Sequence, residues 1–357
     1  ATGDMADERV NFNTTTTTLT DASLSDLTTT NNGPIKLVVA TGTLTVNDGA
    51  AGSINGNNGI GVSANGTGDV LLETRAGDLI VNADVRSDSG HITLNAADDV
   101  DQNADVTTSG DTVLVTAFND GSDNTVTVDG IDMQSGVSIV SGGGNIRLVA
   151  DSEGDVLLGL VNAGSGDVSV IAEGDILDNN GSSVLASSAV AAQADVVLTS
   201  AAGFAVGDVI ILRDARSALD AVTSETRTIT AINSNTLTLD ANLSSTFDVA
   251  NNASVTAVNV QADALRLRAD AVVNPDGTQD TVTAGDQAGQ IGQADTTNVT
   301  NVAAVNFNAI DTQVTTLAAQ SAEGIYVLES DGVTIDATGD IAVEQVNFNT
   351  TTTTLTD

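Results

Sequence analysis

The sequence of 357 residues has no cysteine and no tryptophan, a single histidine, and only 2% aromatic residues. Without cysteine, the chain cannot form disulfides, zinc–thiolate sites or a cysteine nucleophile. Positive charge is also scarce, because 10 Lys and Arg stand against 48 Asp and Glu, which gives a net charge of −38. We therefore expect no nucleic-acid partner, since too few cations are present to neutralise phosphates.

Long apolar runs are missing as well. No stretch of about 18 apolar residues is present, so we expect no membrane-spanning helix. Residues 1–20 lack the basic start and apolar core of a signal peptide. Hydrophobic residues nevertheless reach 41% of the chain, and nearly all of them are Val, Leu, Ile and Ala. Such a chain can bury a large aliphatic core, unlike a disordered acidic tail.

The two ends of the sequence are nearly identical. Residues 1–21 and 337–357 match at 18 of 21 positions with an offset of 336 residues. The differing pairs are Met5/Ile341, Asp7/Val343 and Arg9/Gln345. We predict a tandem array in which residues 337–357 begin the next 336-residue unit, and in which the two segments are equivalent rungs of one solenoid. The alternative is a single domain with matching end caps, although caps are expected to be polar and atypical.

A shorter repeat lies inside this unit. Gly-Asp followed by aliphatic residues begins at Gly68, Gly77, Gly154, Gly166 and Gly174, and related phrases begin at Gly90, Gly110 and Gly144. The steps from 68 to 90, 90 to 110 and 144 to 166 are 22, 20 and 22 residues. We assign the glycines to turn conformations closed to other residues, and the following Asp or Asn to hydrogen bonds with their own backbone. Short alternating strands between such turns predict an all-β solenoid, because one coil cannot bury its aliphatic face alone.

These phrases in residues 68–178, with residues 312–320 and 324–327, resemble the haemagglutinin-type repeats of filamentous-haemagglutinin-like bacterial surface proteins. The resemblance implies a right-handed parallel β-helix of about 20–22 residues per coil. It also implies secretion, an extracellular location at the bacterial cell surface, and a role in adhesion or in building a fibre. The secretion domain typical of the family's N-terminus is not recognisable here, which leaves the secretion route open.

The repeat is interrupted between residues 195 and 258. This segment holds Arg213, Arg216 and Arg227, three of the ten basic residues. Residues 227–232 and 236–240 alternate around Asn-Ser-Asn at 233–235, which predicts a hairpin. We therefore divide the chain into a first solenoid part at 1–194, an inserted small β-barrel or β-sandwich at 195–258, and a second solenoid part at 259–357. The insert is either a binding module on the solenoid surface or an ornamental domain without a partner.

Candidate catalytic residues are few. His91 occupies the position that Asp fills in the related phrases, so we interpret it as a turn residue rather than a general base. Asp98, Asp99 and Asp101, with Asp105 nearby, are the best carboxylates for a glycoside-cleaving pair. Aromatic residues for binding sugars are scarce outside the insert, and we therefore expect no enzyme and assign no catalytic residue.

Calcium is the cofactor that the composition leaves open, because Ca²⁺ takes six to eight oxygen ligands. The candidate ligands are Asp98, Asp99 and Asp101 in one cluster and Asp120 and Asp123 in a second, and residues 276–280 form a third. None of them matches an EF-hand or the calcium-binding glycine-rich nonapeptide. Stacked coils would also bring the turn carboxylates roughly 5 Å apart, where like charges repel. Diffuse screening by cations is therefore the alternative to specific sites.

These features together predict a non-catalytic structural repeat unit of a giant extracellular fibre or stalk, whose units stack end to end as a continuous solenoid. Its expected partners are adjacent tandem units of the same protein. The alternative is an adhesin segment whose inserted domain binds a cell-surface glycan, a neighbouring filament or another partner.

Overall fold

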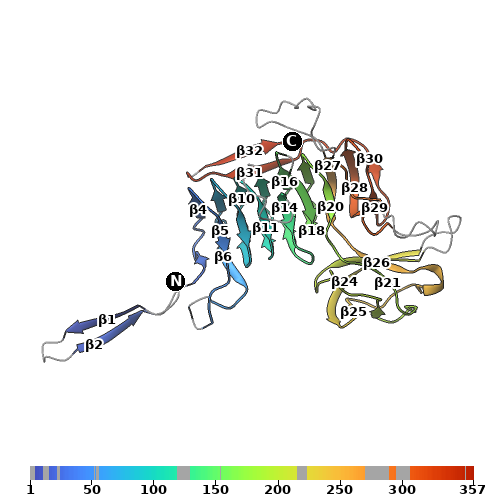
Figure 1. Ribbon diagram of the computed structural model, residues 1–357, viewed down its shortest axis with the longest axis horizontal. Helices are drawn as coiled ribbons and strands as arrows, with labels where there is room; N and C mark the ends of the chain where they lie inside the picture. The colour runs from blue at the N-terminus through green and yellow to red at the C-terminus, as the bar shows by residue number, and fades with distance from the viewer. Residues whose placement is uncertain are drawn as a thin grey trace.

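The computed structural model describes residues 5–10, 16–21, 25–51, 53, 56–118, 129–152, 154–214, 223–269, 289–294, 306–349 and 351–357. Within these residues the chain is all-β, apart from one short 3₁₀ helix, η1 (Val249–Asn251). Figure 1 shows a stack of parallel strands, a smaller β domain on its flank, and a β-hairpin near each end of the chain.

The parallel stack is built from three rows of equivalent strands. Row A contains β4 (Ile35–Val39), β7 (Val70–Thr74), β10 (Ile92–Ala96), β13 (Val113–Ala117), β16 (Ile146–Ala150) and β19 (Val168–Ala172). Row B contains β5 (Leu44–Val46), β8 (Leu79–Val81), β11 (Val100–Gln102), β14 (Gly130–Met133), β17 (Asp155–Leu158) and β20 (Ile176–Asp178). Row C contains β3 (Leu27–Thr28), β6 (Ile60–Ala64), β9 (Asp84–Ser87), β12 (Val106–Thr107), β15 (Ser138–Val140) and β18 (Leu160–Asn162). The chain passes through rows A, B and C in turn and then returns to row A one strand further along, where it pairs in parallel.

Two longer strands, β27 (Val260–Ala269) and β28 (Ile310–Gln320), continue rows C and A together. The first half of β27 pairs with β18 and its second half pairs with β19, so rows A and C form one sheet of 16 strands. β29 (Val327–Glu329) and β30 (Thr334–Ile335) pair with the two halves of β28. The prediction of an all-β chain with many parallel strands is therefore confirmed.

The repeat period sets the core. Row A strands begin at Val70, Ile92 and Val113, which are 22 and 21 residues apart, in agreement with the predicted period. Parallel pairing in register stacks like residues over like residues, so that Leu72 and Leu94 lie over one another inside the stack. Each fully buried leucine contributes roughly 1.5–3 kcal/mol through removal of its side chain from water.

Glycine at the start of row A strands has a different reason from the predicted one. Gly68 and Gly90 do not have a positive φ, although Gly77, at the next corner, does at 98°. A Cβ on Gly90 would lie 2.4 Å from the carbonyl oxygen of Gly68, and a Cβ on Gly68 would lie 2.4 Å from that of Gly33. Glycine is therefore required there because successive backbones approach closely at this corner.

The residue after each of these glycines bonds to the next turn of the chain. Asp69 accepts a hydrogen bond through Oδ1 from the backbone N–H of His91 at 3.1 Å. His91 does the same through Nδ1 for the N–H of Thr112 at 3.3 Å, and Asn145 through Oδ1 for the N–H of Asp167 at 2.9 Å. These side chains therefore bond to the neighbouring turn rather than to their own backbone, and His91 serves as a corner acceptor.

The inserted domain is a separate antiparallel sheet. Its strands are β21 (Ser182–Val184), β22 (Asp195–Val197), β23 (Val209–Asp214), β24 (Thr223–Asn233), β25 (Thr236–Leu239) and β26 (Ser254–Ala257), in the order β21-β26-β23-β24-β25-β22. The predicted hairpin is confirmed as β24–β25. A bridge between Leu185 and Leu198 joins the two edges, which closes the sheet around its own core. The sheet already begins at Ser182, ahead of the predicted boundary at residue 195.

The two repeated end segments are β-hairpins, and the prediction that they are rungs of the stack is wrong. β1 (Met5–Val10) pairs antiparallel with β2 (Thr16–Asp21), and β31 (Ala342–Val346) pairs antiparallel with β32 (Thr352–Thr356). Glu8 pairs with Thr18 and Glu344 with Thr354, so the registers are identical after the 336-residue offset. A short connection suffices for antiparallel strands, whereas a parallel rung needs a long crossover.

We expect Gly90→Ala to lower the free energy of unfolding by about 1–3 kcal/mol, because its methyl group meets the backbone of the preceding turn. Gly332→Ala is the matched control, since no atom lies within 4 Å of its Cβ and its φ is not positive. Urea unfolding of both variants measures the difference, and equal effects would contradict the role of close stacking.

Candidate functional site

Three carboxylates meet at the corner that leads into row B. Asp78 precedes β8, and Asp98 and Asp99 precede the next strand of that row, β11. Each offers an oxygen that lies within 4.8 Å of the other two. Asp98 is 2% and Asp99 1% exposed, while Asp78 is partly exposed. The predicted pair Asp98 and Asp99 is therefore brought together with Asp78, which the sequence analysis did not select.

Asp99 has the strongest need for a counter-charge. Burial raises the pKa of its carboxyl to about 7. The N–H of Gly130, which donates to Oδ1 at 2.6 Å, opposes this shift, and the charges of Asp98, Asp129 and Asp78 add to it. The second oxygen, Oδ2, is buried and has no hydrogen-bond partner among the described residues. The three carboxylates could supply three of the six to eight oxygens that Ca²⁺ takes.

The other predicted ligands do not join this trio. Asp101 lies on β11 opposite Asp132 of β14, and burial raises the pKa of both carboxyls. Asp105 uses Oδ1 to accept a hydrogen bond from the backbone N–H of Ser138 at 2.8 Å. Asp120, Asp123 and residues 276–280 lie outside the described residues.

A second site is the outer face of row A, on which the hairpin β31–β32 lies (Figure 1). The outward-facing positions of the row stack in register, and they are Lys36, Leu71, Thr93, Leu114, Arg147, Ser169 and Arg266. Leu71 and Leu114 are buried but do not belong to the core of the stack. Val343 and Val346 of β31 are buried on the hairpin side. The hairpin therefore covers a second apolar face of the same strands.

Polar contacts fix the hairpin along its whole length. Thr112, directly before β13, accepts the backbone N–H of Glu344 at 2.9 Å, and Thr93 accepts that of Val346 at 2.9 Å. At the end over β4, Lys36 donates to the carbonyl oxygen of Asn347 at 2.6 Å. The hairpin thus spans row A from β4 towards β27.

Asp357 fixes the opposite end of the hairpin. Its carboxylate lies 3.0 Å from Nη1 of Arg266 and 3.5 Å from Nη1 of Arg268, and accepts a hydrogen bond from Ser169 at 2.6 Å. Burial acts to raise the pKa of Asp357, but Ser169, Arg147 and Arg266 outweigh it and hold the pKa below its usual value. The ionised carboxylate is therefore favoured here. Four of the ten Lys and Arg of the chain, at positions 36, 147, 266 and 268, lie on this face.

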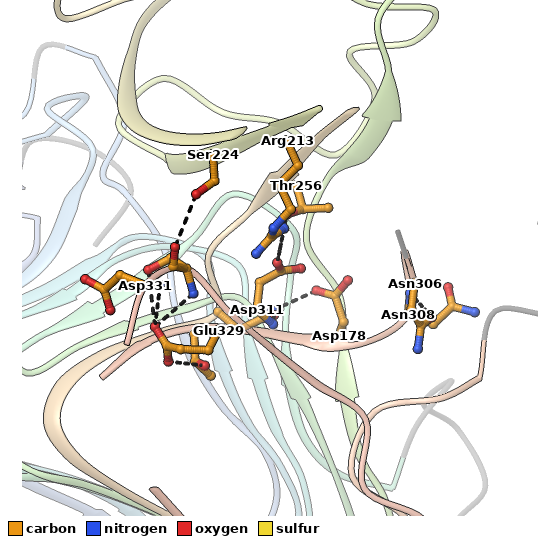
Figure 2. Close-up of polar contacts among 12 residues, drawn as sticks. Asp178, Arg213, Ser224, Thr256, Asn306, Asn308, Asp311, Glu329 and Asp331 are labelled. Carbon is orange, nitrogen blue, oxygen red and sulfur yellow. Dashed lines mark hydrogen bonds and ion pairs between the residues drawn. The ribbon is translucent and has the colours of Figure 1, made fainter. Parts of the chain in front are cut away.

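A third polar cluster joins the inserted domain to the stack. Figure 2 shows Arg213 of β23 beside Asp311 of β28, and their buried side chains approach to 3.0 Å. Thr256 of β26 donates to the same carboxylate oxygen at 2.8 Å. Burial raises the pKa of Asp311 to about 6, against the opposing effect of Arg213. Because removing one partner of a buried pair leaves an uncompensated charge, this cluster fixes the domain on the stack.

The sequence contained a signal for the hairpin-binding face. Strands buried on one side alternate, yet residues 70–72 and 113–115 are each three aliphatic residues in succession. Such runs indicate strands buried on both faces. Asp78 was also visible, because the 21-residue step from Asp78 to Asp99 matches the repeat period.

We find no family model, curated protein or solved structure that matches this chain. The resemblance to filamentous-haemagglutinin-like proteins therefore stays a prediction. Across the described parts of the chain, no helix has the length and apolar character needed to cross a membrane.

The raised pKa of Asp99 predicts a pH-dependent stability. Between about pH 4 and pH 7 the folded state holds a proton on Asp99 that the unfolded state has lost, so its contribution to stability falls as the pH rises. Asp99→Asn keeps the oxygen that accepts from Gly130 and cannot ionise. We expect it to be more stable than the parent by about 1–3 kcal/mol at pH 8, with no gain at pH 4.

Urea unfolding at the two pH values measures this difference. Burial also raises the pKa values of Asp178, Asp208 and Asp311, so the variant should reduce the pH slope rather than remove it. Asp331→Asn, at an exposed position, is the control. The same gain at pH 4 and pH 8 would contradict an effect of ionisation.

Proposed function

We propose that the chain is a non-catalytic structural unit of a giant extracellular fibre or stalk at a bacterial cell surface, repeated in tandem every 336 residues. One observation carries the proposal: the same hairpin occurs twice in the same register, and the hairpin that begins the next unit packs on the stack of this one. The first residues of a unit thus have a binding site on the unit before it.

In this proposal the parallel stack is a right-handed parallel β-helix. The passage through rows A, B and C with an advance of one strand per circuit supports the helix. The handedness follows the general rule for connections between parallel strands, which are right-handed in about 98% of cases. The hairpins interrupt the helix between units, so the array is a series of linked stacks rather than the uninterrupted solenoid expected from the sequence.

The N-terminal end of the stack supports contact between units. A cavity of about 400 Å³ opens there, lined by Leu37, Leu44, Val46, Val62 and Leu72 among others. These are residues of the first strands of each row and of the strand that follows β4. An open apolar end of this kind fits the end of a neighbouring stack, because each turn of a solenoid buries its core against the next.

We also propose that Ca²⁺ occupies the corner of Asp78, Asp98 and Asp99. The buried Oδ2 of Asp99 and the three converging carboxylates support this assignment. In a chain of net charge −38, a bound cation relieves repulsion that hydrogen bonds alone do not remove.

The alternative function is adhesion through the inserted domain. The exposed apolar side chains of Val190, Val206 and Val249 favour it, because all three lie in this domain. An adhesin requires a glycan, cell surface or other partner for the domain, whereas the structural function requires only further copies of the unit.

Calcium should stabilise the parent protein at pH 8 by binding the folded state alone. At a concentration about 100 times the dissociation constant, the gain in the free energy of unfolding is about 2.7 kcal/mol. Asp99→Asn should lose most of this gain. Thermal unfolding with CaCl₂, compared with NaCl at equal ionic strength, separates specific binding from screening. Equal responses of the two proteins would exclude the site.

A polypeptide with three copies of residues 1–336, followed by residues 337–357, should form a rod that lengthens by a constant amount per unit. Nine described strands follow one another along row A and its continuation, so at about 4.8 Å per strand the increment is roughly 40 Å. Small-angle scattering and electron microscopy of one-, two- and three-unit chains measure it. Compact particles, or particles without a regular increment, would contradict the proposal.

A further inference from the structure

The hairpin β1–β2 lies apart from the stack in Figure 1, whereas its repeat β31–β32 lies on row A. We propose that residues 1–21 bind row A of a second copy of this unit, in the position that residues 337–357 occupy here. The inference rests on the proposed function when the second copy is the neighbouring tandem unit. Between separate chains, the same contact joins two molecules.

The binding face is already shaped for this hairpin. Its outward positions combine apolar Leu71 and Leu114 with hydroxyl acceptors at Thr93 and Thr112. Cations lie near both ends of the bound hairpin, at Lys36 and at Arg266. Because basic residues are scarce elsewhere in this acidic chain, the face is suited to a ligand that carries a carboxylate at one end and free carbonyl oxygens at the other.

The N-terminal hairpin carries the groups that make these contacts. The backbone N–H groups that bond to Thr112 and Thr93 belong to Glu344 and Val346, which correspond to Glu8 and Val10. The carbonyl oxygens that Lys36 contacts belong to Asn347 and Asn349, and Asp357 supplies the carboxylate. Their counterparts are Asn11, Asn13 and Asp21, so every one of these positions is identical in the two segments.

One difference sets the strength of binding. Val343 is 1% exposed on the face, and Asp7 takes its place in the N-terminal segment. Burying an unpaired carboxylate is unfavourable. Residues 1–21 therefore bind this row A more weakly than residues 337–357, which are also tethered to it. The C-terminal hairpin thus keeps the face occupied within one chain, and binding from a second chain requires its release.

The experiment releases the C-terminal hairpin in the full chain. Asp357→Lys places a cation beside Arg266 and Arg268 and should free row A. The N-terminal hairpin of another molecule, with Asp21 intact, then binds it. Because this contact joins unlike surfaces, it should give open head-to-tail oligomers whose mass grows with concentration. Sedimentation velocity and light scattering after gel filtration measure the mass, and the parent should stay monomeric.

Further variants identify the hairpin as the ligand. Adding Asp21→Lys to Asp357→Lys should weaken association at least tenfold, and adding Asp7→Val should strengthen it at least tenfold. Asp331→Lys makes the same charge change at an exposed position, and should leave the parent's mass unchanged. Circular dichroism confirms that each variant is folded. Asp357→Asn is the milder variant that decides the outcome if Asp357→Lys does not fold.

Two results would overturn the inference. One is a folded Asp357 variant that stays monomeric at all concentrations, even with Asp7→Val. The other is association that Asp21→Lys does not weaken, since a different surface would then be responsible. Neither result bears on the length increment of the three-unit polypeptide, so failure of hairpin exchange and failure of the tandem proposal are distinguishable.

Discussion

The stack depends on a hydrogen bond between successive turns of the chain at their corners. Strands pair through their backbones, but at a corner the chain changes direction and its N–H groups leave the ladder. Asp69, His91 and Asn145 each accept the N–H of the equivalent residue one turn later. The preceding glycine permits the close approach that this bond needs, since a Cβ on Gly90 would collide with the turn below. Glycine and acceptor therefore recur together, and the repeat period follows from them.

The same bond explains where the negative charge is placed. A carboxylate is a strong acceptor, so many of the 48 acidic residues serve the backbone and are not merely solubilising. Asp155 and Asp175 in row B repeat the pattern, with Oδ1 accepting the N–H of the next turn at 2.7 Å and 2.8 Å. Stacking places these charges one above another, and burial at Asp99 raises the carboxyl pKa to about 7. The corner that is best satisfied through its backbone is thus the one with the greatest electrostatic strain, which is why it is the natural position for a cation.

The sequence predicts the parts of this fold that arise from local repetition. The 20–22-residue period, the parallel strands and the β24–β25 hairpin all follow from alternation and turn residues. Asp98 and Asp99 could also be selected, because adjacent carboxylates at a corner are visible in the sequence. The hairpin fold of residues 337–357 was missed, since a Thr-rich strand reads alike in a rung and in a hairpin. Its binding to row A depends on which outward positions, such as Leu71 and Leu114, happen to align across turns, and a single phrase does not reveal that.

The hairpin changes what kind of object a unit is. In a solenoid each turn contacts only its neighbours, so stability adds turn by turn and the array has no natural boundary. The bound hairpin contacts Lys36 on β4 and Arg268 on β27, which lie at opposite ends of row A and never touch one another directly. Loosening any turn between them disturbs the hairpin, and releasing the hairpin exposes apolar side chains of several turns at once. The turns of one unit are therefore coupled to one another and to the first residues of the next unit. This coupling gives a repetitive chain a boundary every 336 residues, where it would otherwise have none.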